Sequence, residues 1–248
     1  LEWMHAKMFV DGEFEYLGTG GVKLSVDYGI PSSNMITLGT DYKWEAGTKR
    51  DILSDIMDAK IQISDLCNGI VDYALVNSKV LKWMALDDSI QTLLQKSSFG
   101  QGDLFKKVGG KIIGVNAKVL GNLLDIQNLV VYDEKYVVEQ TLTAALAASG
   151  TTVYVGDTAD FETGTAVLVD VSEGTSEEVT ISAVNTEAGT LTTSASTGAY
   201  KAGEDKIIMT KAFIPDNKFV MFASQVDGQK IAEFKQAYRA VLDELGET

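Results

Sequence analysis

The sequence predicts an α+β fold that is interrupted by a small all-β module. Strand-like alternation and helix-like spacing of apolar residues interleave over residues 1–140 and again from residue 207, which is typical of chains that pack helices against sheets. Residues 141–206 are instead rich in Thr, Gly, Ala and Val, and show only short alternating runs. We therefore expect one α+β domain made of residues 1–140 and 207–248, with an inserted β module over residues 141–206.

The N-terminal part predicts a helix followed by a hairpin. Apolar residues have helical spacing over residues 1–10 and stop at the turn signal Asp11-Gly12. Apolar and polar residues then alternate over residues 13–16 and 22–28, which predicts two strands with one buried face, ended by Pro31.

The middle of the first segment mixes helices and strands. A stripe of apolar residues from Ile52 to Ile63 predicts an amphipathic helix, which Thr48 and Asp51 would cap. Asn77-Ser78 precedes another helical pattern. The remaining expected elements are strands over residues 70–76, 129–132 and 136–138 and a helix over residues 116–124.

The inserted module carries much of the charge of the chain. Ten acidic and two basic residues lie between 141 and 206, so the module has a net charge of −8 out of −14 for the whole chain. Short strands are expected around Val153, Val167, Val179 and Leu191. This polar composition indicates a module that faces solvent.

The closing segment predicts two strands and a helix. Residues 207–209 and 213–222 read as strands, with Pro215-Asp216 as a turn inside the second stretch. Apolar residues then recur at helical spacing, which predicts an amphipathic C-terminal helix. These residues are Ile231, Phe234, Tyr238, Val241 and Leu245.

Composition excludes several classes of function. The chain of 248 residues has 21 Lys and Arg against 35 Asp and Glu, whereas phosphate binding needs a basic face. Its one cysteine, Cys67, excludes an internal disulfide and a cysteine-based zinc site. One histidine, His5, weakens any catalytic triad. No apolar run approaches the roughly 20 residues of a membrane span, and no signal segment opens the chain.

The candidate chemical groups each have a simpler structural interpretation. Gly18–Gly21 lies between two expected strands, so a hairpin loop is favoured over a phosphate cradle. The helical carboxylates Asp51, Asp55 and Asp58 favour a solvated face over a cation site.

The adjacent pairs Asp87-Asp88 and Glu177-Glu178 point apart, so neither forms an acid–base dyad. Cys67 has no histidine near it in the sequence, and a quiet thiol is favoured. Trp44 and Trp83 are expected to anchor a core or an interface. We assign no catalytic residue, no cofactor site and no metal site, and expect a structural protein rather than an enzyme.

Two stretches give the chain a family resemblance. Residues 22–31 (VKLSVDYGIP), followed by Trp44 and a helix with regularly spaced Asp residues, form the first. Residues 213–221 (FIPDNKFVM) form the second. Together they resemble the major capsid proteins of lambda-type tailed phages, the capsid protein E family. Residues 73–81 and 129–138 are also similar to strand segments of that family.

The resemblance implies an HK-97-like capsid fold with a peripheral and an axial domain. Residues 1–10 would then be the end of the family's long spine helix, with the N-terminal arm and extended loop upstream. It further implies a subunit of a phage or prophage head that binds other copies of itself in capsomers. Scaffold or decoration proteins are the other partners the family implies, with no specific nucleic acid and no membrane. Assembly would take place in the bacterial host cytoplasm, which a free cysteine fits, and the product would be the capsid of the virion.

Two other functions remain open at the level of sequence. The Thr- and Gly-rich module could recognise a ligand in a non-enzymatic, adhesin-like binding protein, with the α+β part as its base. An enzyme that uses only carboxylates, such as a glycosidase, would need a cleft with two carboxylates about 5–9 Å apart. The sequence places no such pair.

The charge balance gives a first testable prediction. We expect no gel shift of duplex DNA at micromolar protein and roughly 150 mM salt, because a net charge of −14 opposes neutralisation of phosphates. A clear shift under these conditions would contradict the interpretation of the charge.

Overall fold

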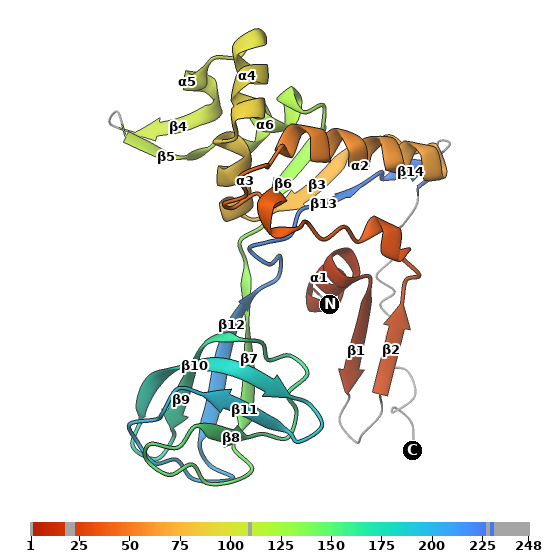
Figure 1. The fold of residues 1–248 in the computed structure, drawn as a ribbon. Helices are drawn as coiled ribbons and strands as arrows, with labels where there is room; N and C mark the ends of the chain where they lie inside the picture. The colour runs from red at the N-terminus through yellow and green to blue at the C-terminus, as the bar shows by residue number, and fades with distance from the viewer. Residues whose placement is uncertain (1, 18–22, 109–110, 227–228, 231–248) are drawn as a thin grey trace, which may run out of the picture. The chain divides into compact units, whose positions relative to one another are not determined.

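The computed structural model describes residues 2–17, 23–108, 111–226 and 229–230. The chain divides into two compact units, each built from two separate stretches of sequence. Unit 1 comprises Leu1–Gly29 and Asp133–Asp216, and unit 2 comprises Ile30–Tyr132 and Asn217–Thr248. Figure 1 shows both units, and each is described here by itself.

Unit 1 contains a six-stranded barrel. Its strand order is β7-β12-β9-β10-β11-β8, and every neighbouring pair is antiparallel. The chain just after β7 returns to β8, where Leu142 forms a bridge with Val155 and the Thr143 amide donates to the Tyr154 carbonyl at 2.8 Å. These contacts close the sheet on itself. The strands are β7 (Lys135–Thr141), β8 (Thr152–Tyr154), β9 (Gly164–Asp170), β10 (Thr175–Asn185), β11 (Thr190–Thr193) and β12 (Lys206–Ala212).

The barrel has its own core, built by the period of two along each strand. In β9 the side chains of Ala166, Leu168 and Asp170 are buried while those between them are more exposed. The core shares no residue with that of unit 2. Its buried members are Val138, Leu142, Leu146, Val153, Val155, Phe161, Ala166, Leu168, Val179, Ile181, Leu191, Tyr200, Ile207 and Met209.

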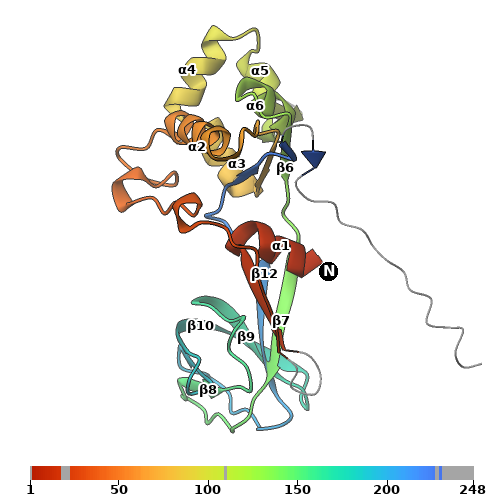
Figure 2. The same ribbon diagram turned by 90° about the vertical axis from the view of Figure 1, so that its right-hand side faces the viewer.

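The barrel extends beyond the residues 141–206 that the sequence assigned to the module. β7 and β12 were expected to belong to the flanking α+β domain, but β12 pairs with β9 from Lys206 to Ile208 as well as with β7. Val138 and Met209 fill the barrel core. Figure 2 shows β7 and β12 side by side, and the division between the units falls at 132/133 and 216/217.

The first 29 residues also belong to unit 1. The predicted helix and hairpin are confirmed as α1 (Glu2–Asp11), β1 (Glu13–Leu17) and β2 (Lys23–Asp27). β1 and β2 pair antiparallel, with Phe14 opposite Val26. Phe14 is buried, and its ring lies 6.3 Å from that of Tyr28.

Unit 2 is built on a three-stranded sheet with the order β13-β3-β6. β3 and β6 are parallel, and β13 returns antiparallel to β3. The expected helices over residues 52–63, from residue 78 and over residues 116–124 are confirmed, as are the strands over residues 70–76 and 129–132, with shorter bounds for the first strand. The expected strands over residues 213–222 are wrong except at Val220–Phe222, and the two helices between residues 88 and 104 were not predicted. The elements are α2 (Ile52–Cys67), β3 (Tyr73–Val76), α3 (Ser78–Ala85), α4 (Asp88–Lys96), α5 (Gln101–Leu104), α6 (Ala117–Leu123), β6 (Asn128–Val131) and β13 (Val220–Phe222). Two short 3-10 turns, Ser32–Asn34 and Thr40–Tyr42, precede α2.

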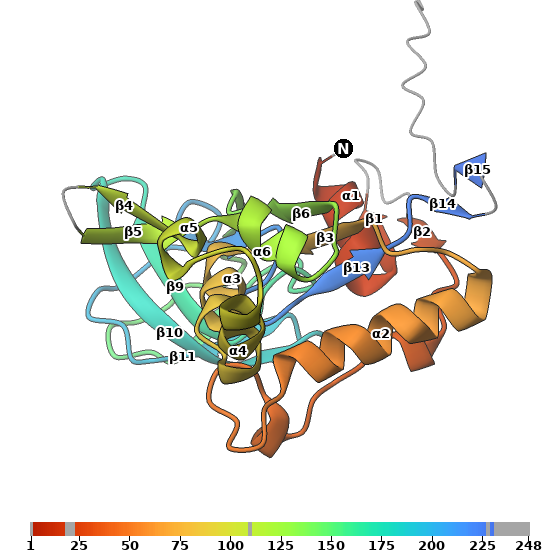
Figure 3. The same ribbon diagram turned by 90° about the horizontal axis from the view of Figure 1, so that it is seen from above.

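Only the first turns of α2 are buried. Ile52 and Ile56 are enclosed in the core of unit 2, whereas Met57, Ile61 and Leu66 are exposed. Seen from above in Figure 3, the second half of α2 runs clear of α3 and α4. A long helix that buries one end therefore leaves several apolar side chains at its surface.

A hairpin in unit 2 has no counterpart in the sequence-based expectations. β4 (Phe105–Val108) and β5 (Lys111–Val115) pair antiparallel, with a bulge at Ile113 between the pairs Lys106–Gly114 and Lys107–Ile112. Their sequence mixes lysines and aliphatic residues without regular alternation, because neither face of the hairpin is buried along its whole length.

The end of the chain is described only in part. After β13 the short strands β14 (Gln225–Val226) and β15 (Gln229–Lys230) pair with each other. The predicted C-terminal helix, from Ile231 to Leu245, lies outside the described residues. Among the described residues, every helix is too short or too polar to cross a membrane.

The separation of the two cores predicts that unit 2 folds alone. Val131 of β6 and Val220 of β13 lie at the same end of β3, beside Val76 and Leu75. Two strand spacings separate them, about 10 Å. We expect a variant that lacks residues 1–29 and carries a short Gly/Ser linker in place of residues 133–216 to retain one cooperative thermal transition by circular dichroism.

Deletion of residues 142–205 alone supplies the comparison. That variant keeps β7 and β12 but exposes Val138, Ile207 and Met209, so we expect aggregation or a much lower melting temperature. If the variant with the smaller deletion melted as cooperatively as the one with the larger deletion, the folding of β7 and β12 would not depend on the other strands of the barrel.

Candidate functional site

The three helical carboxylates do not form a common acidic face. Asp51 is the N-cap of α2, and its carboxylate accepts a hydrogen bond from the Ser54 amide at 3.1 Å. Asp55 accepts a hydrogen bond from Nε1 of Trp44 at 2.7 Å. Asp58 is exposed, and no hydrogen bond to its carboxylate occurs within the described part of the chain. Two of the three carboxylates therefore have structural roles, as an N-cap and as the partner of a tryptophan.

The pair Asp87-Asp88 divides between the interior and the surface. Asp87 is 2% exposed, and its carboxylate accepts hydrogen bonds from the amide and hydroxyl of Ser89 as the N-cap of α4. Nε of Arg50 lies 3.4 Å from Asp87 Oδ2, so the buried carboxylate has a cationic partner. Asp88 is exposed. The expectation that these neighbours point apart is confirmed, and Asp87 stabilises the fold.

Glu177 and Glu178 also point to opposite faces of β10. The carboxylate of Glu177 accepts hydrogen bonds from the Thr197 amide at 3.0 and 2.9 Å and from the Thr197 hydroxyl. Burial raises the pKa of Glu177, but the hydrogen bonds from Thr197, Gly198 and Tyr200 outweigh it and leave the pKa below its ordinary value. Burial and the neighbouring charge of Glu177 raise the pKa of Tyr200 to about 12.

A second carboxylate of the barrel is held in the same way. Asp170 accepts hydrogen bonds from the Glu173 amide and the Ser172 hydroxyl, each at 2.8 Å, and these bonds lower its pKa. Asp205 is fully buried and accepts from the amides of Val171 and Lys201. The acidic groups at this end of the barrel therefore bind backbone amides of its turns.

The tryptophans pack as expected, and the thiol lies at the surface. The ring of Trp44 lies 5.1 Å from that of Phe219, and both rings pack against the core of unit 2. Trp83 is partly buried against the same core. Cys67 is exposed at the end of α2, where its thiol donates to the Ile63 carbonyl at 3.1 Å. The His5 side chain and the loop Gly18–Gly21 lie outside the described residues.

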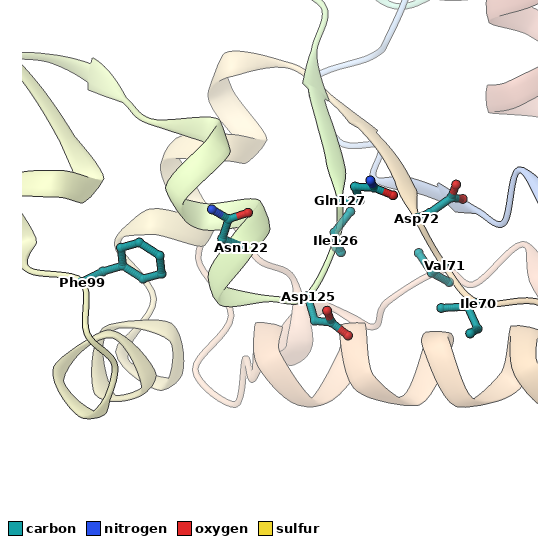
Figure 4. A pocket seen from close by; sticks show the side chains of 8 residues that line it. All are labelled: Ile70, Val71, Asp72, Phe99, Asn122, Asp125, Ile126 and Gln127. Carbon is teal, nitrogen blue, oxygen red and sulfur yellow. The ribbon is translucent and has the colours of Figure 1, made fainter.

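Within the described ranges, no three His, Cys, Asp or Glu side chains gather as they would around a metal ion. A shallow pocket of about 590 Å³ lies in unit 2, at the amino ends of β3 and β6 (Figure 4). Open α/β sheets bind ligands at the carboxyl ends of their strands instead. The pocket is lined by Ile70, Val71, Asp72, Phe99, Asn122, Asp125, Ile126 and Gln127.

The two carboxylates of this pocket already have partners. The Asp72 carboxylate accepts a hydrogen bond from the Ser224 amide at 2.7 Å, and Asp125 lies 3.6 Å from Nζ of Lys60. Ile70 is 78% exposed at the rim. Both oxygens of Asp72 are thus engaged by Ser224 and are not available to orient a small ligand in the depression.

Exposed apolar side chains are the feature that the fold leaves without a structural role. Isolated examples are normal on a protein surface, but contiguous groups mark interaction sites. Unit 2 carries three sets of exposed apolar residues that lie near one another in sequence, which we call its apolar surface segments. They are Ile30, Met35, Ile36 and Tyr42 before α2, Met57 and Ile61 on α2, and Val108, Ile112 and Ile113 on the β4–β5 hairpin.

Comparison with known proteins gives only distant likenesses. No protein-family model and no curated protein matches the chain. Two solved structures with partial similarity are both phage-related. One is the Gp54 tailspike of Acinetobacter baumannii bacteriophage AP22, solved with A. baumannii capsular saccharide, at 13% identity and a TM-score of 0.26. The other is a phage-related protein from Bordetella bronchiseptica, at 13% identity and a TM-score of 0.32.

The extent of these alignments differs. The likeness covers 38% of this chain and 16% of the tailspike, against 75% of this chain and 55% of the Bordetella protein. The chain thus spans little more than half of the second structure and a small part of the first. At these TM-scores the comparisons do not establish a shared fold.

The lowered pKa values in the barrel predict sensitivity to acid. The ordinary values are 3.8 for Asp170 and 4.5 for Glu177, so the stability these carboxylates contribute is complete above about pH 5. It is lost as the pH falls through their lower folded values. We expect Glu177→Gln to lower the melting temperature at pH 7 and to flatten its dependence on pH between 5 and 3.

Glu178→Gln provides the matched control for this measurement. Its side chain lies on the outer face of β10 and has no hydrogen-bond partner within the described part of the chain. If both variants shifted the melting curve equally, the hydrogen bonds of Glu177 to Thr197 would not be the source of the acid sensitivity.

Proposed function

We propose that this chain is a structural subunit of a bacteriophage or prophage head, which assembles with other copies of itself into an icosahedral shell that encloses DNA. The observation that carries the proposal is the set of apolar surface segments of unit 2, together with the motifs at residues 22–31 and 213–221. Exposed aliphatic groups of this kind are what association between subunits buries.

The polar chemistry of the chain supports a structural role. The carboxylates that the sequence singled out include Asp51, Asp55, Asp87 and Glu177, and all four are used in caps, a tryptophan contact or turn hydrogen bonds. Such groups hold a fold rigid without offering a reactive site. The role we propose needs no catalytic residue, cofactor or metal.

The charge of the chain fits the inside of a DNA container. A wall with a net charge of −14 per chain repels packaged DNA instead of binding it. The barrel carries a large share of this charge, and we propose that it decorates a surface of the shell. The HK-97-like architecture and the location in the virion capsid belong to the same proposal.

Electron microscopy of the protein tests the proposal directly. We expect the product of the complete gene, expressed in bacteria and viewed in negative stain, to form rings or closed shells. The double variant Met57→Gln/Ile61→Gln should reduce these particles strongly, because it removes an apolar segment while keeping good helix formers. Ser64→Gln, an exposed polar position of the same helix, is the control.

The alternative outcomes separate the competing functions. A product that remains monomeric at milligram-per-millilitre concentration would contradict the shell. A monomer that bound a glycan through the barrel would favour the adhesin-like function instead.

A further inference from the structure

We infer that the tip of the β4–β5 hairpin of one copy binds the outer face of the barrel of a second copy of this chain. This inference rests on the proposed self-association and specifies its partner. By the hairpin tip we mean six residues, Lys106, Lys107, Val108, Lys111, Ile112 and Ile113. By the outer barrel face we mean Glu139, Val167, Val169, Glu178 and Ile208.

The hairpin is anchored at its base and unsupported at its tip. Leu104 is fully buried, and Phe105 and Val115 pack against the core of unit 2. Beyond them Val108, Ile112 and Ile113 are 65%, 60% and 63% exposed. In Figure 1 the hairpin extends away from α3 and α6.

Such a tip is an unfavourable arrangement in water. A two-stranded ribbon is marginally stable by itself, and three large aliphatic side chains contribute no hydrophobic stabilisation while they are exposed to solvent. The bulge at Ile113 adds an unpaired residue to β5 and redirects the side chains there. The geometry is that of an arm that becomes buried on a partner.

The charge of the tip identifies what kind of partner it fits. Lys106, Lys107 and Lys111 surround the aliphatic residues, and the stretch from residue 104 to 124 contains four lysines and no acidic residue. The chain as a whole has a net charge of −14, so this segment is a local basic exception. An acidic surface with an apolar centre is complementary to it.

The outer face of the barrel has that composition. Strand register places four residues in one row across β7, β12, β9 and β10, because Ile208 pairs with both Glu139 and Val167, and Val167 pairs with Glu178. Val169 is the next outward residue of β9. The aliphatic side chains of the row are partly exposed, and glutamates stand at its two ends.

Glu178 is the better placed of the two glutamates to form an ion pair with a lysine of the hairpin tip. Glu139 already lies 2.6 Å from Nζ of Lys206, whereas the Glu178 carboxylate has no hydrogen-bond or ion-pair partner in the described ranges. Three aliphatic residues with lysines around them thus match three aliphatic residues of the barrel, two of which stand between glutamates. The net charge of −8 over residues 141–206 favours the approach of the lysines at longer range.

The binding partner is a second copy of this chain, because the chain itself carries both the hairpin tip and the outer barrel face. Contact between two different patches of identical subunits is heterologous, and it produces closed rings when the rotation between neighbours closes. Nucleic acid fits the tip less well, since phosphate binding makes no use of Val108, Ile112 and Ile113 and the net charge of the chain opposes it.

Sedimentation velocity of charge-reversed variants tests the contact. Ser176 is exposed on β10 and pairs with Val169, beside the outer barrel face. We expect Lys107→Glu/Lys111→Glu, and separately Ser176→Lys/Glu178→Lys, to weaken self-association at least about tenfold, because each makes the two surfaces repel. An equimolar mixture of the two double variants should associate again. Lys118→Glu and Glu187→Lys are exposed reversals outside both surfaces and serve as controls, with melting curves to show that every variant is folded.

Each result decides the inference. Weakening in both double variants, recovery in their mixture and unchanged controls would support it. Unchanged association of the double variants would overturn the inference and leave the proposed self-association intact. Weakening without recovery in the mixture would overturn the pairing of these two surfaces. If the wild type bound duplex DNA and Lys107→Glu/Lys111→Glu did not, the inference would be overturned in favour of a nucleic-acid contact. A wild-type protein that stays monomeric at every concentration would also overturn the inference. The proposed function would still be decided separately, by whether the product of the complete gene forms particles.

Discussion

The antiparallel pairing of β7 with β12 is the contact on which the layout of the chain depends. Seven pairs, from Lys135 opposite Ala212 to Thr141 opposite Lys206, bring the two ends of the inserted segment together, and the Phe213 amide extends the ladder to the Glu134 carbonyl. Because the ends meet, the chain can leave the sheet of unit 2 after β6 and return to it at β13 on the other side of β3. Two hydrophobic cores then form without sharing a residue.

Several carboxylates in each unit accept hydrogen bonds from backbone amides. Asp51 and Asp87 cap helices, while Asp170, Glu177 and Asp205 hold turns of the barrel. Hydrogen bonds to an ionised acceptor are about twice as strong as neutral ones, which explains how an acidic chain gains order from its negative groups. These carboxylates thus have structural roles in the fold.

The two units display different surfaces. The barrel displays acidic and small polar groups around a row of aliphatic residues, and unit 2 displays longer apolar side chains and a basic hairpin. Segregation of opposite charge into different parts of one chain favours ordered association between copies over random aggregation, because like surfaces repel. An aliphatic centre with a charged rim is also the usual composition of a specific interface.

The sequence by itself determined the elements whose pattern is local. The first helix and hairpin, α2, α3, α6 and the short strands around Val153, Val167, Val179 and Leu191 all follow from spacing and turn signals within a few residues. Tertiary structure alone decided that β7 and β12 belong to the barrel, because strand pairing depends on partners far away in the sequence, such as Val169 for Lys206. It likewise decided that Asp87 meets Arg50 and Glu177 meets Thr197, since the sequence showed only that neighbouring carboxylates point apart. The β4–β5 hairpin escaped prediction for the same reason: its residues follow no burial pattern, because within one copy nothing in the described part of the chain buries its tip.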